Sequence, residues 1–300
     1  MKGYDVLERR TDLAVEAREL AGEDISGVEY TSREESGMEI SRLVVKNHNA
    51  GLKLKKDIGT YITIDVPAMT DNFLSTDDRV LTIGKEIRRL LPVNGLVLVC
   101  GLGNIEITPD ALGPKSASRV LATRHITGEI ARSTGLDRLR PVAVLSTGVT
   151  GQTGIETFEY IESIVSKVRP NAVVVIDALA SRRLTRLGCT LQISDAGISP
   201  GSGVQNHRKS INRQSVGVPV ISLGVPTVVD AVTLVCDVLE VNDAKTYEQL
   251  KDSLSPDNRS MVVTPKEIDL LIDRASRLIS MSLNCALQTE VELSVLESLM

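Results

Sequence analysis

Residues 172–177 read Ala-Val-Val-Val-Ile-Asp, and this stretch is the strongest indication of the fold class. A short, continuous apolar run is typical of a strand that is covered on both faces. Three more runs of the same character occur at 96–100, 142–145 and 218–223. Because strands of this kind need helices on both sides of their sheet, the sequence predicts an α/β fold.

Segments with helical spacing of apolar residues lie between or beside these runs. They span 77–91, 116–131, 154–167 and 265–283. Alternation of strands and helices predicts a largely parallel sheet, and the last helix is expected to pack on the outside. The stretch 60–66, which is β-branched and alternating, predicts one more strand.

The N-terminal region, residues 1–42, is charged and short of large hydrophobic side chains. A short helical pattern at 14–20 is followed by Gly22, Gly27 and Gly37, which interrupt it. The pattern predicts a loosely packed N-terminal segment.

Composition limits the class of protein. The chain has 300 residues, of which 42% are hydrophobic and 24% are charged, values that suit one sizeable core or two small domains. A net charge of -5 argues against a broad surface for nucleic acid. The sequence has no apolar stretch long enough for a transmembrane helix, and its first ten residues lack the apolar core of a signal peptide.

The four cysteines also favour an intracellular protein. They are Cys100, Cys189, Cys236 and Cys285, and their wide spacing fits neither a zinc site nor a disulfide framework. We expect reduced, mostly buried thiols and a protein that stays in the compartment where it is made.

Two aspartates follow strand ends, where parallel sheets place their ligands and catalytic groups. Asp177 ends the most hydrophobic run, and Asp110 follows the glycine-containing loop after residue 100. Two desolvated carboxylates that lie together do not both ionise easily, so one can hold a proton while the other accepts one. This chemistry can activate water and protonate an amide nitrogen. The alternative is that each aspartate caps a helix.

Glycine-rich turns and one histidine leave further alternatives open. The pair Gly101 and Gly103 lacks the third glycine of a dinucleotide-binding fingerprint. The turn with Gly148, Gly151 and a glycine at 154 could cradle an anion or simply join a strand to a helix. His207 stands in a polar stretch typical of a surface, yet together with Asp110 and Asp177 it could complete a metal site.

Several segments, taken together and in this order, resemble the germination protease family of spore-forming bacteria over nearly the whole chain. They are RTDLAVEA at 10–17, CGLGN at 100–104, TPDALGP at 108–114, GQTGIET at 151–157, IDALASR at 176–182, ISDAGISPGSGV at 193–204 and GVPTVVDA at 224–231. The resemblance implies an endopeptidase that cleaves small acid-soluble spore proteins early in germination, made as a zymogen and assembled as a homotetramer.

The resemblance also implies a site and a fold. Asp110 and Asp177 match the two aspartates assigned as catalytic in the family. The supporting loop residues are Gly101, Gly103, Asn104, Gly148 and Gly151. The implied fold is that of hydrogenase maturation proteases, a three-layer αβα sandwich with a largely parallel sheet, and no cofactor is implied.

Family substrates are cut after an acidic residue and before a hydrophobic one that alanine follows. Thr11-Asp12-Leu13-Ala14 has this pattern, and a poorly packed terminal segment is accessible to cleavage. The resemblance therefore predicts self-processing between Asp12 and Leu13. Residues 1–12 become a propeptide, and 13–300 a single α/β protease domain with an N-terminal extension and a C-terminal helix.

Three other hypotheses stay open from the sequence. The related maturation proteases hold nickel with acidic residues, so the same pair could serve a metal-dependent mechanism. A nucleoside phosphorylase-like transferase and a non-catalytic binding module would fit a related sheet. The expected location is the cytoplasm of the forespore and the spore core, without membrane contact. Because the net charge is acidic, we expect no direct contact with nucleic acid, and we expect the enzyme to attack substrate that is free of DNA.

Overall fold

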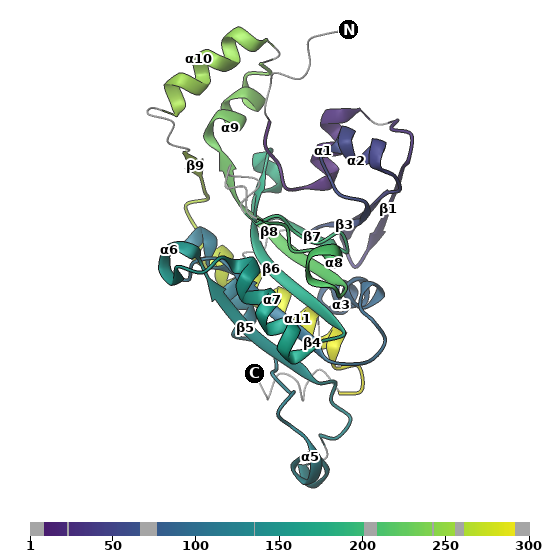
Figure 1. The fold of residues 1–300 in the computed structure, drawn as a ribbon. Coiled ribbons are helices and arrows are strands. Elements are labelled where there is room, and N and C mark those ends of the chain that lie inside the picture. Colours follow the sequence, from purple (N-terminus) through teal and green to yellow (C-terminus); the bar gives the residue numbers. More distant parts are fainter. Residues whose placement is uncertain are drawn as a thin grey trace.

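The computed structural model describes residues 9–22, 24–66, 77–134, 136–200, 209–241, 243–255 and 261–291. Within these ranges, a nine-stranded sheet crosses the molecule (Figure 1). Along the sheet the strands are β1 (Val28–Glu35), β2 (Met38–Val45), β3 (Gly59–Asp65), β7 (Thr190–Ser194), β8 (Val220–Asp230), β6 (Ala172–Ser181), β4 (Val97–Leu102) and β5 (Val142–Gly148), and β9 (Val262–Val263) pairs with β8.

The sheet is mixed, so the prediction of a largely parallel sheet is wrong. The pairings β4–β5, β4–β6 and β6–β8 are parallel, whereas β1–β2, β2–β3, β3–β7, β7–β8 and β8–β9 are antiparallel. The turn between β1 and β2 explains the first antiparallel pair. Ser36 and Gly37 both have positive φ, 55° and 70°, as tight hairpin turns require.

Helices cover both faces of the sheet. One face carries α3 (Asp78–Leu90), α4 (Leu112–Ala117) and α11 (Ile268–Leu287) over the largest apolar core. The opposite face carries α7 (Thr157–Val168) and α8 (Arg213–Val216) over β4 and β6, and α1 (Ala14–Ala21) and α2 (His48–Leu54) over β2 and β3 (Figure 1). The remaining helices are η1 (Thr108–Asp110), α5 (Gly128–Thr134), α6 (Thr150–Thr153), η2 (Leu184–Arg186), α9 (Ala231–Val238) and α10 (Ala244–Leu254).

The C-terminal helix is part of the core rather than an outer addition. In α11 the side chains of Ile272, Ala275 and Leu278 are fully buried, and the helix packs on α3 and α4. Its polar residues face the protein too, since Asn284 receives the backbone N–H of Leu121 and donates to the carbonyl of Arg119. In the described part of the chain, no helix combines the length and the apolar character needed to cross a bilayer.

The predicted helix at 116–131 is largely wrong. Helix α4 ends at Ala117 and α5 starts at Gly128. Between them, Thr123 turns toward the beginning of β5, where its hydroxyl accepts the N–H of Val142 at 2.9 Å and its own N–H donates to the carbonyl of Val142 at 3.0 Å. Hydrogen bonds to a strand therefore replace those of a helical turn.

Residues 9–19 are buried or partly buried, so the prediction of a loose N-terminal segment is wrong for them, whereas residues 20–22 are exposed. Leu13 and Ala14 are fully buried, and so is the carboxylate of Glu16. Glu16 accepts the backbone N–H groups of Arg182 and Arg183 at 2.7 and 3.0 Å. The negative charge of Glu16 suggested a solvated segment. In the structure, backbone N–H groups that follow β6 stabilise this charge instead of water.

Candidate active site

A cavity of about 1130 Å³ lies over the middle of the sheet, on the face that carries α1 and α7. Its floor is polar and contains Asp177, Gln192, Ser194, Ser222 and Gly224. The register pairs Asp177 with Gly224 on β8, and Gly224 with Gln192 on β7. Because paired residues point to the same side of a sheet, Asp177 and Gln192 face the cavity on either side of a glycine.

The sequence suggested that Asp177 ends a strand, but in the structure it lies within β6. Pairing with β8 continues through Ser181, so the helix-cap alternative for Asp177 is wrong. The residue is 6% exposed, and its Oδ1 accepts the N–H of Ala178 at 2.9 Å. A buried strand thus presents this carboxyl group to the cavity.

Asp110 closes η1 and lines the same cavity. Its Oδ2 accepts the backbone N–H of Asn104 at 2.6 Å, and no side chain caps the following helix α4 at Ala111. Two glycines allow the segment around Asp110 to approach the sheet closely. A Cβ on Gly103, where φ is +109°, would lie 2.1 Å from the carbonyl oxygen of Asp110, and one on Gly113 would lie 2.5 Å from that of Ile176. The structure therefore brings Asp110 and Asp177 to one cavity.

The predicted loop residues divide into two groups. Gly103 lines the cavity, whereas Gly101, Asn104, Gly148 and Gly151 do not. Gly101 allows a close approach, because a Cβ there would lie 2.3 Å from the carbonyl oxygen of Gly113. Asn104 accepts the side-chain N–H of Gln152 at 2.7 Å and so joins the loop after β4 to α6. The helix α6 spans only four residues, which gives the anion-binding alternative no support.

The predicted processing site enters the cavity. The N–H of Asp12 donates to the carbonyl of Ala180 at 2.9 Å, and Asp12 Oδ2 accepts the N–H of Ala180 at 2.8 Å. Leu13 is fully buried in an apolar cluster with Val15 and Leu179. The bond between Asp12 and Leu13 is thus held against the strand that carries Asp177. The sequence suggested an exposed bond, and this expectation is wrong.

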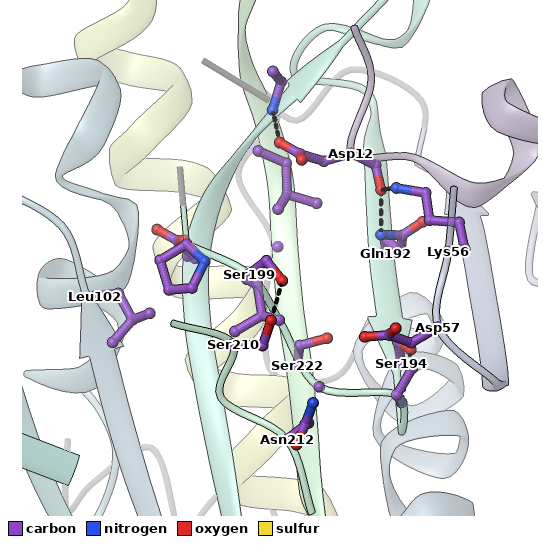
Figure 2. Close-up of a pocket in the computed structure, with 18 of the residues that line it drawn as sticks. Asp12, Lys56, Asp57, Leu102, Gln192, Ser194, Ser199, Ser210, Asn212 and Ser222 are labelled. Carbon is purple, nitrogen blue, oxygen red and sulfur yellow. Dashed lines mark hydrogen bonds between the residues drawn. The ribbon is translucent and has the colours of Figure 1, made fainter. Parts of the chain in front are cut away.

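Sequence patterns missed two residues that hold this segment. Lys56 Nζ donates to the carbonyl oxygen of Asp12 at 2.8 Å, and Gln192 Nε2 donates to the same oxygen at 2.9 Å (Figure 2). The N–H of Ala14 donates to Gln192 Oε1 at 2.7 Å. A signal for Gln192 does exist, because β7 alternates polar and apolar residues and its polar side faces the cavity.

Lys56 follows α2 in a charged stretch that resembles a solvated turn. Desolvation lowers the pKa of Lys56 below the ordinary lysine value, while the carboxylates of Asp12, Glu16 and Asp57 oppose this shift. A Cβ on Gly51 would lie 2.7 Å from the carbonyl oxygen of Lys56, so the glycine allows the chain to turn tightly there.

Comparison with known proteins decides the family. Residues 7–242 match the family described as Germination protease. The chain belongs to the germination protease family. The germination protease of Caldanaerobacter subterraneus subsp. tengcongensis is 43% identical, with 97% of this chain and 98% of that protein covered. The germination proteases of Clostridium perfringens (strain 13 / Type A) and Priestia megaterium are 40% and 33% identical, and cover 95% and 94% of this chain and 96% and 94% of their own length.

Membership makes the chain a protease, and the matched range includes Asp12, Asp110 and Asp177. Among solved structures, the [NiFe] hydrogenase maturation protease HycI from Thermococcus kodakarensis KOD1 is similar with a TM-score of 0.37 and 16% identity, over 66% of this chain and 98% of that one.

For this germination protease, the described residues contain no group of three or more histidine, cysteine, aspartate or glutamate side chains placed to hold a metal ion. His207, the candidate third ligand, lies outside the described residues.

Proposed function

We propose that the chain is an endopeptidase of the aspartic type that is made as a zymogen. It cuts its own bond between Asp12 and Leu13, and the mature enzyme then degrades small acid-soluble spore proteins during germination. The observation that carries this proposal is the shared cavity: Asp12 lines it together with Asp110 and Asp177. Residues 1–12 are the propeptide, and 13–300 form the mature protease domain.

The two carboxyl groups divide the chemistry of hydrolysis. Asp177, the more deeply buried, carries the proton, because burial disfavours the charged form. Asp110, which is only partly buried, is the base in this proposal. Asp110 takes a proton from water as the water oxygen attacks the carbonyl carbon of Asp12. Asp177 protonates the nitrogen of Leu13 as the C–N bond breaks.

The contacts of the bound segment support a preference for an acidic residue before the bond and a hydrophobic one after it. The carboxylate of Asp12 accepts the N–H of Ala180, and the side chain of Leu13 packs with Val15 and Leu179. Strand-like binding of the main chain leaves specificity to such side-chain sites. Spore proteins with the same pattern would bind once the propeptide has left.

The propeptide fills the site until it is cut, which accounts for an inactive precursor. Further contacts hold it in place: Arg10 pairs with Asp230 at 3.0 Å, and Arg9 donates to the carbonyl of Val241 at 2.6 Å. We assign the mature enzyme to the cytoplasm of the forespore and the spore core, as a homotetramer that acts on substrate released from DNA. Equal cleavage rates on free and DNA-bound substrate would contradict the last point.

The test follows the full-length chain during incubation, by intact mass and N-terminal sequencing. Wild-type protein should acquire Leu13 as its new N-terminus, with or without a strong chelator. Asp110→Asn and Asp177→Asn should stay intact, while Asp252→Asn, which removes an exposed carboxylate on α10, should be processed normally. A different new N-terminus would refute the assigned bond. Inhibition by the chelator would turn the aspartates into metal ligands.

A further inference from the structure

The carbonyl oxygen of Asp12 receives two side-chain donors at once. Lys56 Nζ lies 2.8 Å from it and Gln192 Nε2 lies 2.9 Å from it (Figure 2). Lys56 also donates to the carbonyl of Thr11 at 3.3 Å, and Gln192 Oε1 accepts the N–H of Ala14. The pair therefore grips the main chain on both sides of the bond between Asp12 and Leu13.

The strand register fixes Gln192 relative to Asp177. Gln192 and Asp177 sit in register on either side of Gly224, so their Cα atoms are two strand spacings, roughly 10 Å, apart. Gly224 contributes no side chain to the space between them. A Cβ there would lie 2.5 Å from Leu179 Cγ and 2.8 Å from the carbonyl oxygen of Asp177. The glycine thus leaves room for a peptide that is held by Gln192 to pass over the strand.

We propose that Lys56 and Gln192 form an oxyanion-binding pair and are catalytic residues of this protease, a role that rests on the proposed cut at Asp12. When the oxygen of water bonds to the carbonyl carbon of Asp12, the π electrons of the carbonyl move to its oxygen. The two N–H donors stabilise the negative charge that develops there. As the tetrahedral intermediate collapses, the C=O bond reforms and the C–N bond to Leu13 breaks, while the aspartates move the protons.

Both donors should contribute to this stabilisation. Donors that are aimed in advance at a developing oxyanion in a water-poor site are worth about 10²- to 10³-fold in rate each. Lys56 donates in this way only as the ammonium ion. Its pKa, which burial lowers and Asp12, Glu16 and Asp57 raise, lies below the ordinary lysine value. Self-cleavage should therefore slow as the pH rises through that lowered pKa.

The experiment measures the first-order rate of self-cleavage of the full-length chain from neutral to alkaline pH, with the new Leu13 N-terminus as the product. Lys56→Met and Gln192→Ala should each slow cleavage by about 10²- to 10³-fold. Lys56→Arg should restore most of the rate and move the alkaline decline to higher pH. Gln192→Glu, which keeps the acceptor for Ala14 and loses the donor, should be as slow as Gln192→Ala.

Two controls separate catalysis from docking. Arg10→Ala weakens docking of the same segment through Asp230 without touching the carbonyl, so it should keep the wild-type alkaline decline. Lys53→Met removes an exposed lysine of α2 and should leave the rate unchanged.

Rates for Lys56→Met and Gln192→Ala within about threefold of wild type, where each donor should be worth 10²- to 10³-fold, would overturn the oxyanion pair. An alkaline decline that persists in Lys56→Met would remove Lys56 from it. Wild-type protein that never acquires Leu13 as its N-terminus would instead overturn the proposed self-cleavage. Thermal unfolding of each variant identifies a loss of fold, in which case the conservative variants Lys56→Arg and Gln192→Glu decide.

Discussion

The parallel and antiparallel halves of the sheet give different groups to the same cavity. The parallel half supplies carboxyl groups, with Asp110 after β4 and Asp177 on β6. The antiparallel half supplies the N–H donors to the Asp12 carbonyl, with Lys56 before β3 and Gln192 on β7, and it adds the carboxylates of Asp57 and Asp195 to the cavity lining. The halves meet where β8 pairs parallel with β6 and antiparallel with β7. A site that spans the change of strand direction can combine acid–base groups with groups that hold the substrate.

Among the variants that compare the two halves of the sheet, the largest effect is expected from Gly103→Ala, which moves Asp110 without changing its charge. The new Cβ would lie 2.1 Å from the carbonyl oxygen of Asp110, at a φ of +109°. A shift of about 1 Å in a catalytic group costs on the order of 100-fold in rate. Self-cleavage should fall at least that far, as followed by intact mass. Wild-type cleavage in this variant would mean that the position of Asp110 does not matter.

Ile40→Ala tests whether the antiparallel half contributes to stability independently of the chemistry. Ile40 lies on β2, is 1% exposed and packs in the core on the side of the sheet away from the cavity. Truncation of a buried isoleucine should lower the free energy of unfolding by about 2–5 kcal/mol. We expect this loss in urea unfolding of the protein in an Asp177→Asn background, which should stay uncleaved if Asp177 is catalytic. In the single variant Ile40→Ala, which keeps Asp177, the rate of self-cleavage per folded molecule should not change. A slower rate would show that the two halves of the sheet are more tightly coupled than proposed.

Gly224→Ala tests the seam between the halves. Its methyl group must displace Leu179 or the backbone of Asp177, with an expected loss of about 1–3 kcal/mol in stability and slower self-cleavage. Gly151→Ala is the matched control, because nothing lies within 4 Å of a Cβ there and the glycine does not line the cavity. Similar behaviour of the two variants would argue against a need for glycine at the seam.

The smallest effect is expected at the outer edge of the antiparallel half. Glu29 on β1 pairs with Lys46, and their side chains are 62% and 49% exposed. Solvent screens such a pair, so Glu29→Gln should change the free energy of unfolding by less than about 1 kcal/mol. Urea unfolding at low and high salt checks this, and a larger change would assign the edge a role in stability that its exposure does not suggest.

Part of the fold could be predicted because local patterns determine it. The helix expected at 77–91 is α3, Asp78–Leu90, where Asp77 accepts the N–H of Arg79 at the first turn. The strand expected at 60–66 is β3, Gly59–Asp65. The apolar runs at 172–176 and 218–223 are strands as well, but β6 and β8 extend beyond them through polar and glycine residues. Hydrogen bonding between β6 and β8, and not the strand preference of the added residues, explains why the two strands are longer than predicted.

Strand direction and the packing of the N-terminal segment could not be predicted. Polar residues in β1 suggested a solvated region, yet the hairpin turn at Ser36 and Gly37 pairs the strand with β2. The charge of Glu16 suggested exposure, yet main-chain donors from distant residues bury it. Such partners lie far away in the chain, so no local pattern reveals them.

The α/β class, the family motifs that carry Asp110 and Asp177, and the acidic–hydrophobic pair Asp12 and Leu13 can all be recognised in the amino-acid sequence. That Asp12 lines the cavity and that Leu13 is buried beside it follow from the tertiary structure alone. Lys56 and Gln192 reach the carbonyl of Asp12 across 44 and 180 positions of the chain. Strand order, strand direction and register determine which side chains meet over a sheet. Hydrophobic patterns fix only which residues are buried.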